Sequence, residues 1–355
     1  MSLSTKTYPS LSTNTYPPLE QLLEQARRRI EVTAPELAEA RTRRSEVAEI
    51  LRNEFTGCRV YCNGSIAHGD ALTPLVDVDL GIVIPDPGHR YGPGKRGPSE
   101  LKERAAEALR TGLREKYGDL RIEVKGRKRS ILIRFRDPLR PGWEDFTADV
   151  IVAIDNPYAR GLYIPRWDSW DRSDPETHTS LVLDAIEKTD KTYSRTIRLL
   201  KHWARQYDKP ALCSWHIKAL ALGCLTRPTS LLTALEIWFD YAIAELNQRD
   251  TPDPAHVGPD IKTPDNDRRA AIRRLEKARD TLHEAISLEQ DGWGVLAHEA
   301  LANFFGDPDM LPRPERAKVI GQHAARLRAR RRPDHRAAAA VALVPARPAV
   351  RSWAP

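Results

Sequence analysis

The sequence predicts an α+β fold in which the first half of the chain forms a mixed sheet and the second half is entirely helical. Up to about residue 176, helical and strand-like segments follow each other in the order helix, two strands, helix, three strands. From about Thr177 onward, apolar residues recur with the 3.6-residue period of helices and the strand pattern disappears. A chain of 355 residues can bury one large core or two modest ones, which allows two lobes.

The N-terminal part divides into a polar segment and a helical one. Residues 1–16 are rich in Pro, Ser and Thr, and we expect them to be flexible. Residues 17–55 have helical spacing, and we expect their helices to pack on both lobes. Thr33 and Pro35 mark a break at which Thr33 can cap a second helix.

The sheet is predicted within residues 56–176. The strand-like segments are CRVYCNG, VDVDLGIVI, LRIEVKG, SILIRFR and DFTADVIVAID. A Gly- and Pro-rich loop spans Asp86–Glu100, and an amphipathic helix follows it through Lys116.

A helical domain is predicted over residues 177–312. It contains a long Pro/Asp-rich loop, Arg249–Asn266, and then a charged helix. Residues 313–355 form a basic tail rich in Arg, Ala and Pro. From Ala317 onward the chain has nine Lys/Arg and one acidic residue, so the rest of the chain has a net charge of −1. We expect the tail to be a solvated, partly disordered extension, with contact to nucleic acid or an anionic surface as the alternative.

The composition argues against several classes of protein. No apolar run approaches the ~18–20 residues of a membrane span, and the polar N-terminus lacks the apolar core of a secretory signal. We therefore expect a cytoplasmic protein that does not use a membrane. Four cysteines, with only Cys58 and Cys62 close in sequence, fit buried thiols better than a zinc site or a disulfide framework.

Two aspartates interrupt the apolar strand VDVDLGIVI. Asp77 and Asp79 are two residues apart, so both side chains point to the same face, about 7 Å apart along the backbone. Like charges on one face of an apolar sheet are unfavourable unless a cation lies beside them. Mg²⁺ prefers a few carboxylates with water and phosphate oxygens, and a pair of such ions assists phosphoryl transfer.

The neighbouring segments fit the same chemistry. The Gly64–Ser65 turn lets the backbone approach a polyphosphate and offers a hydroxyl and N–H groups to its oxygens. Asp149 lies within FTADVIVAI, a strand otherwise free of charge, and is our candidate for a third carboxylate. Asp145 is the alternative, although it lies at the end of the strand, where a solvated turn residue is expected.

These motifs resemble a known superfamily. The run NGS…DVDLGIVI…ADVIVAI is similar to the hG(G/S)…(D/E)h(D/E)h…D pattern of the nucleotidyltransferases that include DNA polymerase beta. TIRLLKHWARQYDKPALCSWHIKALAL resembles the helical domain of oligoadenylate synthases and of the cGAS/DncV-like nucleotidyltransferases (CD-NTases). YIPRWDSWDRSDPETH and PDPAHVGPDIKTPDN look like connecting loops of bacterial members. The resemblance covers roughly Leu19 to Pro312.

The resemblance implies a catalytic nucleotidyltransferase domain over 56–176, an oligoadenylate-synthase-like domain over 177–312, and a role for each matching residue. Two Mg²⁺ ions, or Mn²⁺, would be held by Asp77, Asp79 and Asp149. The donor triphosphate would be bound by Gly64, Ser65, Lys201 and Ser214, with Lys201 at the β- and γ-phosphates. The alternatives are a solvated helix lysine for Lys201 and a helix N-cap for Ser214.

Two positions depart from the family's pattern. Gly69-Asp70 stands where Gly-Thr is common, and Lys218 stands where Glu is common. The position of Asp70 suggests no role. We expect His68 to be a polar residue at a helix start. We expect Trp203, Trp215 and Trp238 to be core residues, with base stacking as the alternative.

The leading functional hypothesis is an enzyme that joins two or three nucleoside triphosphates into a cyclic product. We expect a monomer that needs no nucleic acid to fold. The resemblance implies a role in bacterial antiphage signalling, with the product activating a separate effector. One alternative is a template-independent RNA or tRNA nucleotidyltransferase, which the −1 charge of residues 1–316 disfavours. Another alternative is an enzyme that transfers a nucleotide to an antibiotic. A further one is a non-catalytic nucleotide-binding protein, which is disfavoured because all three expected metal-binding carboxylates are present.

Overall fold

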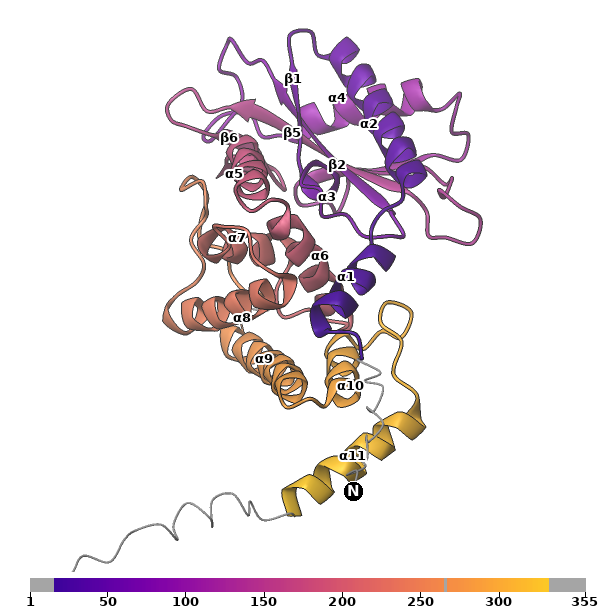
Figure 1. The fold of residues 1–355 in the computed structure, drawn as a ribbon. Helices are drawn as coiled ribbons and strands as arrows, with labels where there is room; N and C mark the ends of the chain where they lie inside the picture. Colours follow the sequence, from indigo (N-terminus) through magenta and orange to yellow (C-terminus); the bar gives the residue numbers. More distant parts are fainter. Residues whose placement is uncertain (1–15, 265–266, 332–355) are drawn as a thin grey trace, which may run out of the picture.

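The computed structural model describes residues 16–264 and 267–331 and divides them into a sheet lobe and a helical lobe (Figure 1). The helical lobe has its own apolar core, and the sheet lobe has a large core on one face of the sheet and a small apolar cluster on the other face. The mixed α/β fold with a C-terminal helical region is the fold class that the sequence predicted.

Seven strands form one mixed sheet. Its central order is β1-β2-β5-β4-β3, and β6 and β7 extend it from β5. The β2 and β5 strands are parallel, whereas the other pairs are antiparallel. The bounds are β1 (Arg59–Cys62), β2 (Asp77–Ile84), β3 (Arg121–Glu123), β4 (Ser130–Arg134), β5 (Thr147–Asp155), β6 (Leu162–Arg166) and β7 (Ser169–Ser173).

The β6–β7 hairpin was not predicted. The sequence pattern indicated a connecting loop in this segment, but its residues pair from Leu162↔Ser173 to Arg166↔Ser169. Only Leu162, Ile164 and Pro165 are buried, so the apolar alternation is too short to be recognised as two strands. The hairpin turns at Trp167, which has a positive φ of 54° that is unusual for a tryptophan.

Alternation along β2 gives the sheet two different faces. Val78, Leu80 and Ile82 point into the core beneath α2 (Ala34–Glu54) and α4 (Ser99–Leu113). Asp77 and Asp79 therefore point to the opposite face. Thr33 caps α2 through a reciprocal capping box with Glu36, as the sequence predicted for this break.

The helical lobe is built around large aromatic side chains. Trp203 and Trp238 are buried in its core, as predicted. Leu19, Leu22 and Leu23 of α1 also belong to this core, so α1 packs on the helical lobe while α2 packs on the sheet. The helices are α1 (Leu19–Arg29), α5 (Pro175–Lys188), α6 (Thr192–Arg205), α7 (Ser214–Cys224), α8 (Leu231–Gln248), α9 (Arg268–Gln290), α10 (Gly294–Phe305) and α11 (Arg316–Arg331).

The chain ends differ in part from expectation. Tyr16, within the segment expected to be flexible, shares a 2.6 Å hydrogen bond with Nδ1 of His298. The basic tail begins with α11, which leads away from the helical lobe in Figure 1 and rests on it through the buried Val319. The predictions for residues 1–15 and 332–355 concern segments outside the described residues. Among the residues that are described, no helix is long and apolar enough to cross a membrane.

Candidate active site between the two lobes

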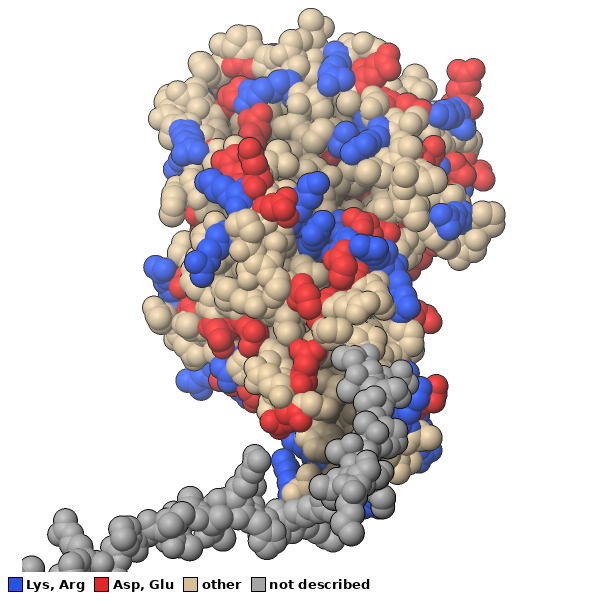
Figure 2. Space-filling view, viewed as in Figure 1, with Lys and Arg blue, Asp and Glu red and all other residues tan. Residues whose placement is uncertain are grey.

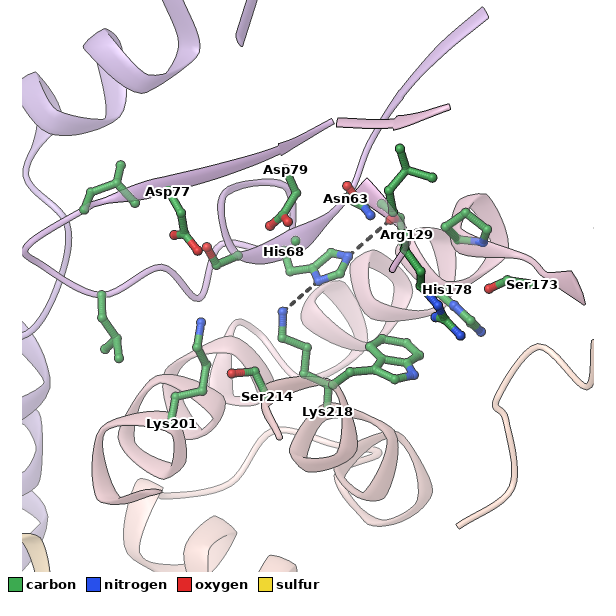
Figure 3. A pocket seen from close by; sticks show the side chains of 18 of the residues that line it. Asn63, His68, Asp77, Asp79, Arg129, Ser173, His178, Lys201, Ser214 and Lys218 are labelled. Carbon is green, nitrogen blue, oxygen red and sulfur yellow. Dashed lines mark hydrogen bonds between the residues drawn. The ribbon is translucent and has the colours of Figure 1, made fainter. Parts of the chain in front are cut away.

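A cavity of about 400 Å³ lies between the sheet lobe and the helical lobe. Asn63, Gly64 and Ser65 line it together with Asp77 and Asp79 from the sheet side. Helices α6 and α7 line the facing side with Lys201, Arg205, Ser214, Trp215 and Lys218. Figure 3 shows the two aspartates on the sheet side, facing the lysines and Ser214 of the helices. The cavity thus brings acidic groups and cationic groups from distant parts of the chain together.

The three candidate metal ligands share one face of the sheet. Asp79 is the register partner of Asp149 on the adjacent parallel strand, and Asp77 is the partner of Thr147. Because residues paired in register on neighbouring strands project to the same side, Asp149 lies beside Asp79. The spacing of two residues along β2 and a lone acid in β5 were the two sequence signals for this arrangement.

Gly64 allows the backbone to pass directly over Asp79. Gly64 has a φ of +76° and begins the short helix α3 (Gly64–Ala67). A Cβ atom at this position would lie 1.7 Å from Oδ2 of Asp79. Both the left-handed conformation and the close approach therefore require glycine here.

The carboxylates repel one another. Burial raises the pKa of Asp79 to about 6, and the negative charges of Asp77 and Asp149 act in the same direction. A divalent cation among these groups would remove the repulsion, and carboxylate oxygens are suitable ligands for Mg²⁺. The residues present therefore fit the predicted metal.

Asp149 is not among the residues that line the cavity, and its partly exposed carboxylate is bound by its own neighbours. Ser130 Oγ donates a 2.5 Å hydrogen bond to Oδ1 of Asp149, and Arg127 Nη2 donates to the same oxygen at 3.2 Å. Across residues 16–264 and 267–331, no three His, Cys, Asp or Glu side chains are already grouped closely enough to hold an ion alone. Water and phosphate oxygens would complete the coordination, as Mg²⁺ commonly requires.

Asp145, the alternative third carboxylate, lies just before β5. Both of its carboxylate oxygens are buried, without a hydrogen-bond partner among the described residues. The charges that raise the pKa of Asp79 come from Asp77 and Asp149. Asp149 is therefore favoured over Asp145 as the neighbour of Asp79, because Asp145 is not among the charges that raise this pKa.

Lys201 and Ser214 both line the cavity on the side that faces the aspartates. Ser214 is the first residue of α7, whose N-cap is Cys213, so Ser214 is not the cap itself. Lys201 is buried rather than solvated, and its Nζ lies 2.8 Å from Oδ1 of Asp70. Asp70, for which the sequence suggested no role, is therefore the anionic partner of a candidate phosphate-binding lysine.

Three further residues differ from expectation. His68 is buried and lies at the C-terminal end of α3 rather than at a helix start, and it contacts Thr179 and Lys218. Trp215 is only partly buried against the helical core and also lines the cavity, with its ring centroid 4.5 Å from that of His178. Arg205, which the sequence motifs did not indicate, lies one helical turn after Lys201, and this i+4 spacing could have identified it.

The four cysteines are free thiols, and Cys213 is exposed while the other three are partly buried. The expectation of buried thiols therefore holds only in part.

Structural comparison relates this arrangement to solved enzymes. No protein-family model and no curated protein matches the sequence. CdnG of Bradyrhizobium diazoefficiens, a CD-NTase solved with GTP, is similar over 83% of this chain and 97% of its own, with a TM-score of 0.60 and 15% identity. CdnC of E. coli MS115-1, solved with HORMA-deltaN, is similar over 80% and 95%, with a TM-score of 0.59 and 16% identity.

A third solved structure shares the fold. The DncV cyclic AMP-GMP synthase of Vibrio cholerae, described as a prokaryotic cGAS homologue, is similar over 81% of this chain and 85% of its own, with a TM-score of 0.51 and 18% identity. This relationship is the one that the sequence motifs predicted. The chain therefore has the fold of the cGAS/DncV-like nucleotidyltransferases, the CD-NTases.

Proposed function

We propose that this protein is a metal-dependent nucleotidyltransferase that joins nucleoside triphosphates, with release of pyrophosphate, into a cyclic di- or trinucleotide. The observation that carries the proposal is that Asp77 and Asp79 face Lys201 and Ser214 across one cavity, with Asp149 in register with Asp79 on the adjacent strand. Its fold neighbours support it, because DncV is named as a cyclic AMP-GMP synthase and CdnG was solved with GTP.

The reaction forms one bond and breaks one. A ribose hydroxyl oxygen attacks the α-phosphorus of a triphosphate, and the bond from that phosphorus to the bridging oxygen breaks to release pyrophosphate. Asp149, in register with Asp79 on the adjacent strand, would help to orient the hydroxyl or to accept its proton. Mg²⁺ or Mn²⁺ held by Asp77, Asp79 and Asp149 would stabilise the charge that develops on the phosphoryl oxygens.

The residues around the carboxylates bind and orient the triphosphate. Ser65 and the N–H groups at the start of α3 lie beside Asp79 and can donate to phosphate oxygens. Lys201 and Ser214 can donate from the opposite wall. The triphosphate is thus held between the two lobes, with its α-phosphate toward the aspartates.

A second transfer within the same cavity closes the ring. The 3′- or 2′-hydroxyl of the linear intermediate attacks the remaining triphosphate, and a second pyrophosphate leaves. A third nucleotide would give a trinucleotide. By the same resemblance, we propose that the product activates a separate effector in antiphage signalling.

Elongation of RNA is the main competing activity. It would need a basic face on the folded part of the protein to hold the RNA backbone. On the face in Figure 2, Lys and Arg side chains are interspersed with Asp and Glu, which disfavours a long anionic ligand there. Residues 1–316 also have a net charge of −1.

The test is incubation of the purified protein with Mg²⁺ or Mn²⁺ and labelled nucleoside triphosphates, with and without RNA. Phosphatase treatment then removes the terminal phosphates of unused triphosphates and of linear products, and chromatography separates the dephosphorylated linear products from a cyclic product, which has no terminal phosphate. We expect a phosphatase-resistant product that forms without RNA. Label found only on elongated RNA would overturn the proposal.

A further inference from the structure

The two positions at which the sequence departs from the family's pattern contact one another. Nζ of Lys218 lies 2.8 Å from Oδ2 of Asp70, although the residues come from different lobes. Oδ1 of the same carboxylate lies 2.8 Å from Nζ of Lys201. Asp70 is fully buried, so one buried carboxylate is shared by two ammonium groups.

Each ammonium group keeps donor capacity for a ligand. Lys201 donates to Oδ1 of Asp70 at 2.8 Å and to its backbone oxygen at 2.9 Å, and Lys218 donates to Nδ1 of His68 at 2.8 Å. The contact of Lys218 with Oδ2 of Asp70 is an ion pair without hydrogen-bond geometry. An ammonium group has three N–H donors, so at least one on each lysine remains available to a ligand. Both lysines line the cavity, and in Figure 3 both reach from their helices toward Asp77 and Asp79.

The charges of this cluster do not cancel. His68 is buried, and burial and the charge of Lys218 hold its pKa at about 3, so it is neutral and accepts from Lys218. Two ammonium groups and the carboxylate of Asp70 therefore leave one net positive charge. Tyr193 Oη donates to the backbone oxygen of Lys218 at 2.9 Å, which fixes the helix beneath that side chain.

We propose that Lys218 is a second phosphate-binding cation of the cavity and that Asp70 is a positioning residue that holds Lys218 and Lys201 at its wall. This inference rests on the proposed function only in taking a nucleoside triphosphate as the ligand. The polyphosphate chain is the part of that ligand that would contact the lysines, since ammonium groups recognise phosphate oxygens. The nucleobase and the ribose would not contact Lys218.

The test measures binding without turnover. Each of the four α,β-methylene nucleoside triphosphates is titrated with Mg²⁺ into the full-length protein, and the tightest is carried forward with its parent nucleoside. The variants are Lys218→Met, Asp70→Asn and the double variant. Lys277→Met on α9 and Asp119→Asn in the sheet lobe are exposed, matched controls.

A phosphate-binding role predicts that only triphosphate binding changes. Lys218→Met removes a charge-assisted contact, so the triphosphate should bind about tenfold more weakly or worse. Asp70→Asn keeps both ammonium groups but releases them from their positions, so the triphosphate should bind more weakly by a smaller factor. The two effects should be less than additive in the double variant, because Asp70 cannot position a lysine that is absent. Nucleoside binding should not change in any of the three variants.

A purely structural role predicts a different pattern. Lys218→Met would then weaken nucleoside binding as much as triphosphate binding, or would leave both unchanged, and either result overturns the inference. Fully additive effects of Lys218→Met and Asp70→Asn would overturn the positioning role of Asp70. If Asp70→Asn does not fold, the triphosphate-to-nucleoside comparison in Lys218→Met decides alone. Triphosphate binding that depends on Lys218 without any cyclic product would overturn the proposed function but leave this inference standing.

Discussion

A Cβ atom on Gly64 would lie 1.7 Å from Oδ2 of Asp79, so the backbone of the candidate nucleotide-binding turn directly contacts a candidate metal ligand and leaves no space for a side chain. Gly64 also has a φ of +76°, which side chains disfavour. The turn and the strand are therefore fixed relative to one another. A substitution at Gly64 consequently tests whether Asp79 must keep its position.

Gly64→Ala should lose activity far beyond its effect on stability. The positive φ costs about 1–2 kcal/mol of folding free energy, and the methyl group must also displace the carboxylate. Gly57→Ala is the control, because Gly57 has a φ of +78° but its Cβ would meet only Pro85 at an ordinary 3.6 Å. Comparable activity in the two variants, measured beside their urea midpoints, would contradict a positional role for Asp79.

Asp149→Asn should reduce product formation on the order of 100-fold or more, whereas Asp145→Asn should change it only a few-fold. The reason is that Asp149 lies in register with Asp79 and adds to its negative surroundings, whereas Asp145 lies before the strand begins. Initial rates at saturating nucleotide and Mg²⁺ measure the difference. The opposite ranking would move the third carboxylate to Asp145.

Ser130→Ala should raise the Mg²⁺ concentration needed for half-maximal activity by about 10–100-fold, because residues that orient metal ligands have effects of that size. Ser130 Oγ donates to Asp149 Oδ1 at 2.5 Å and fixes that carboxylate. Ser169→Ala, on the exposed β6–β7 turn, serves as the control. Identical Mg²⁺ titrations for the two variants would show that Ser130 does not act through the metal site.

His68 should make the protein less stable in acid. Burial, followed by the charge of Lys218, lowers its pKa from 6.5 to about 3 in the folded state. Between these values the unfolded chain binds a proton that the folded protein does not, so this contribution is complete above pH 6.5 and is lost as the pH falls.

The measurement compares denaturant unfolding of wild type and His68→Gln from pH 7.5 to 5. Below pH 6, the free energy of unfolding of the wild type should fall by about 1 kcal/mol more per pH unit than that of His68→Gln. His283→Gln, an exposed histidine on α9, should leave the pH dependence unchanged. Parallel curves for wild type and His68→Gln would mean that His68 is protonated in the folded protein.

The sequence predicted most of the sheet side of the site because local patterns encode it. Asp77 and Asp79 follow from the two-residue period of a strand, and Asp149 stands out as a single charge in an apolar run. The β6–β7 hairpin was not predicted, because its strands are largely exposed and apolar and polar residues alternate only weakly along them. Local patterns thus identified the carboxylates but not every strand.

The charge cluster could not be predicted in the same way. Asp70 and Lys201 are 131 residues apart, and no local period relates them. His68 and Lys218, which are 150 residues apart, come together only when α7 packs against the sheet lobe. Such pairs depend on how two lobes meet, which a single sequence does not specify.

The sharpest test of cyclic product formation is the ratio of pyrophosphate released to nucleotide incorporated, measured without RNA in wild type and in Asp77→Asn/Asp79→Asn. Closing a ring forms as many phosphodiester bonds as there are nucleotides, so we expect one pyrophosphate per nucleotide for wild type and no release for the variant. A ratio of about one half, which a linear dinucleotide gives, or unchanged release from the variant, would contradict the proposed function.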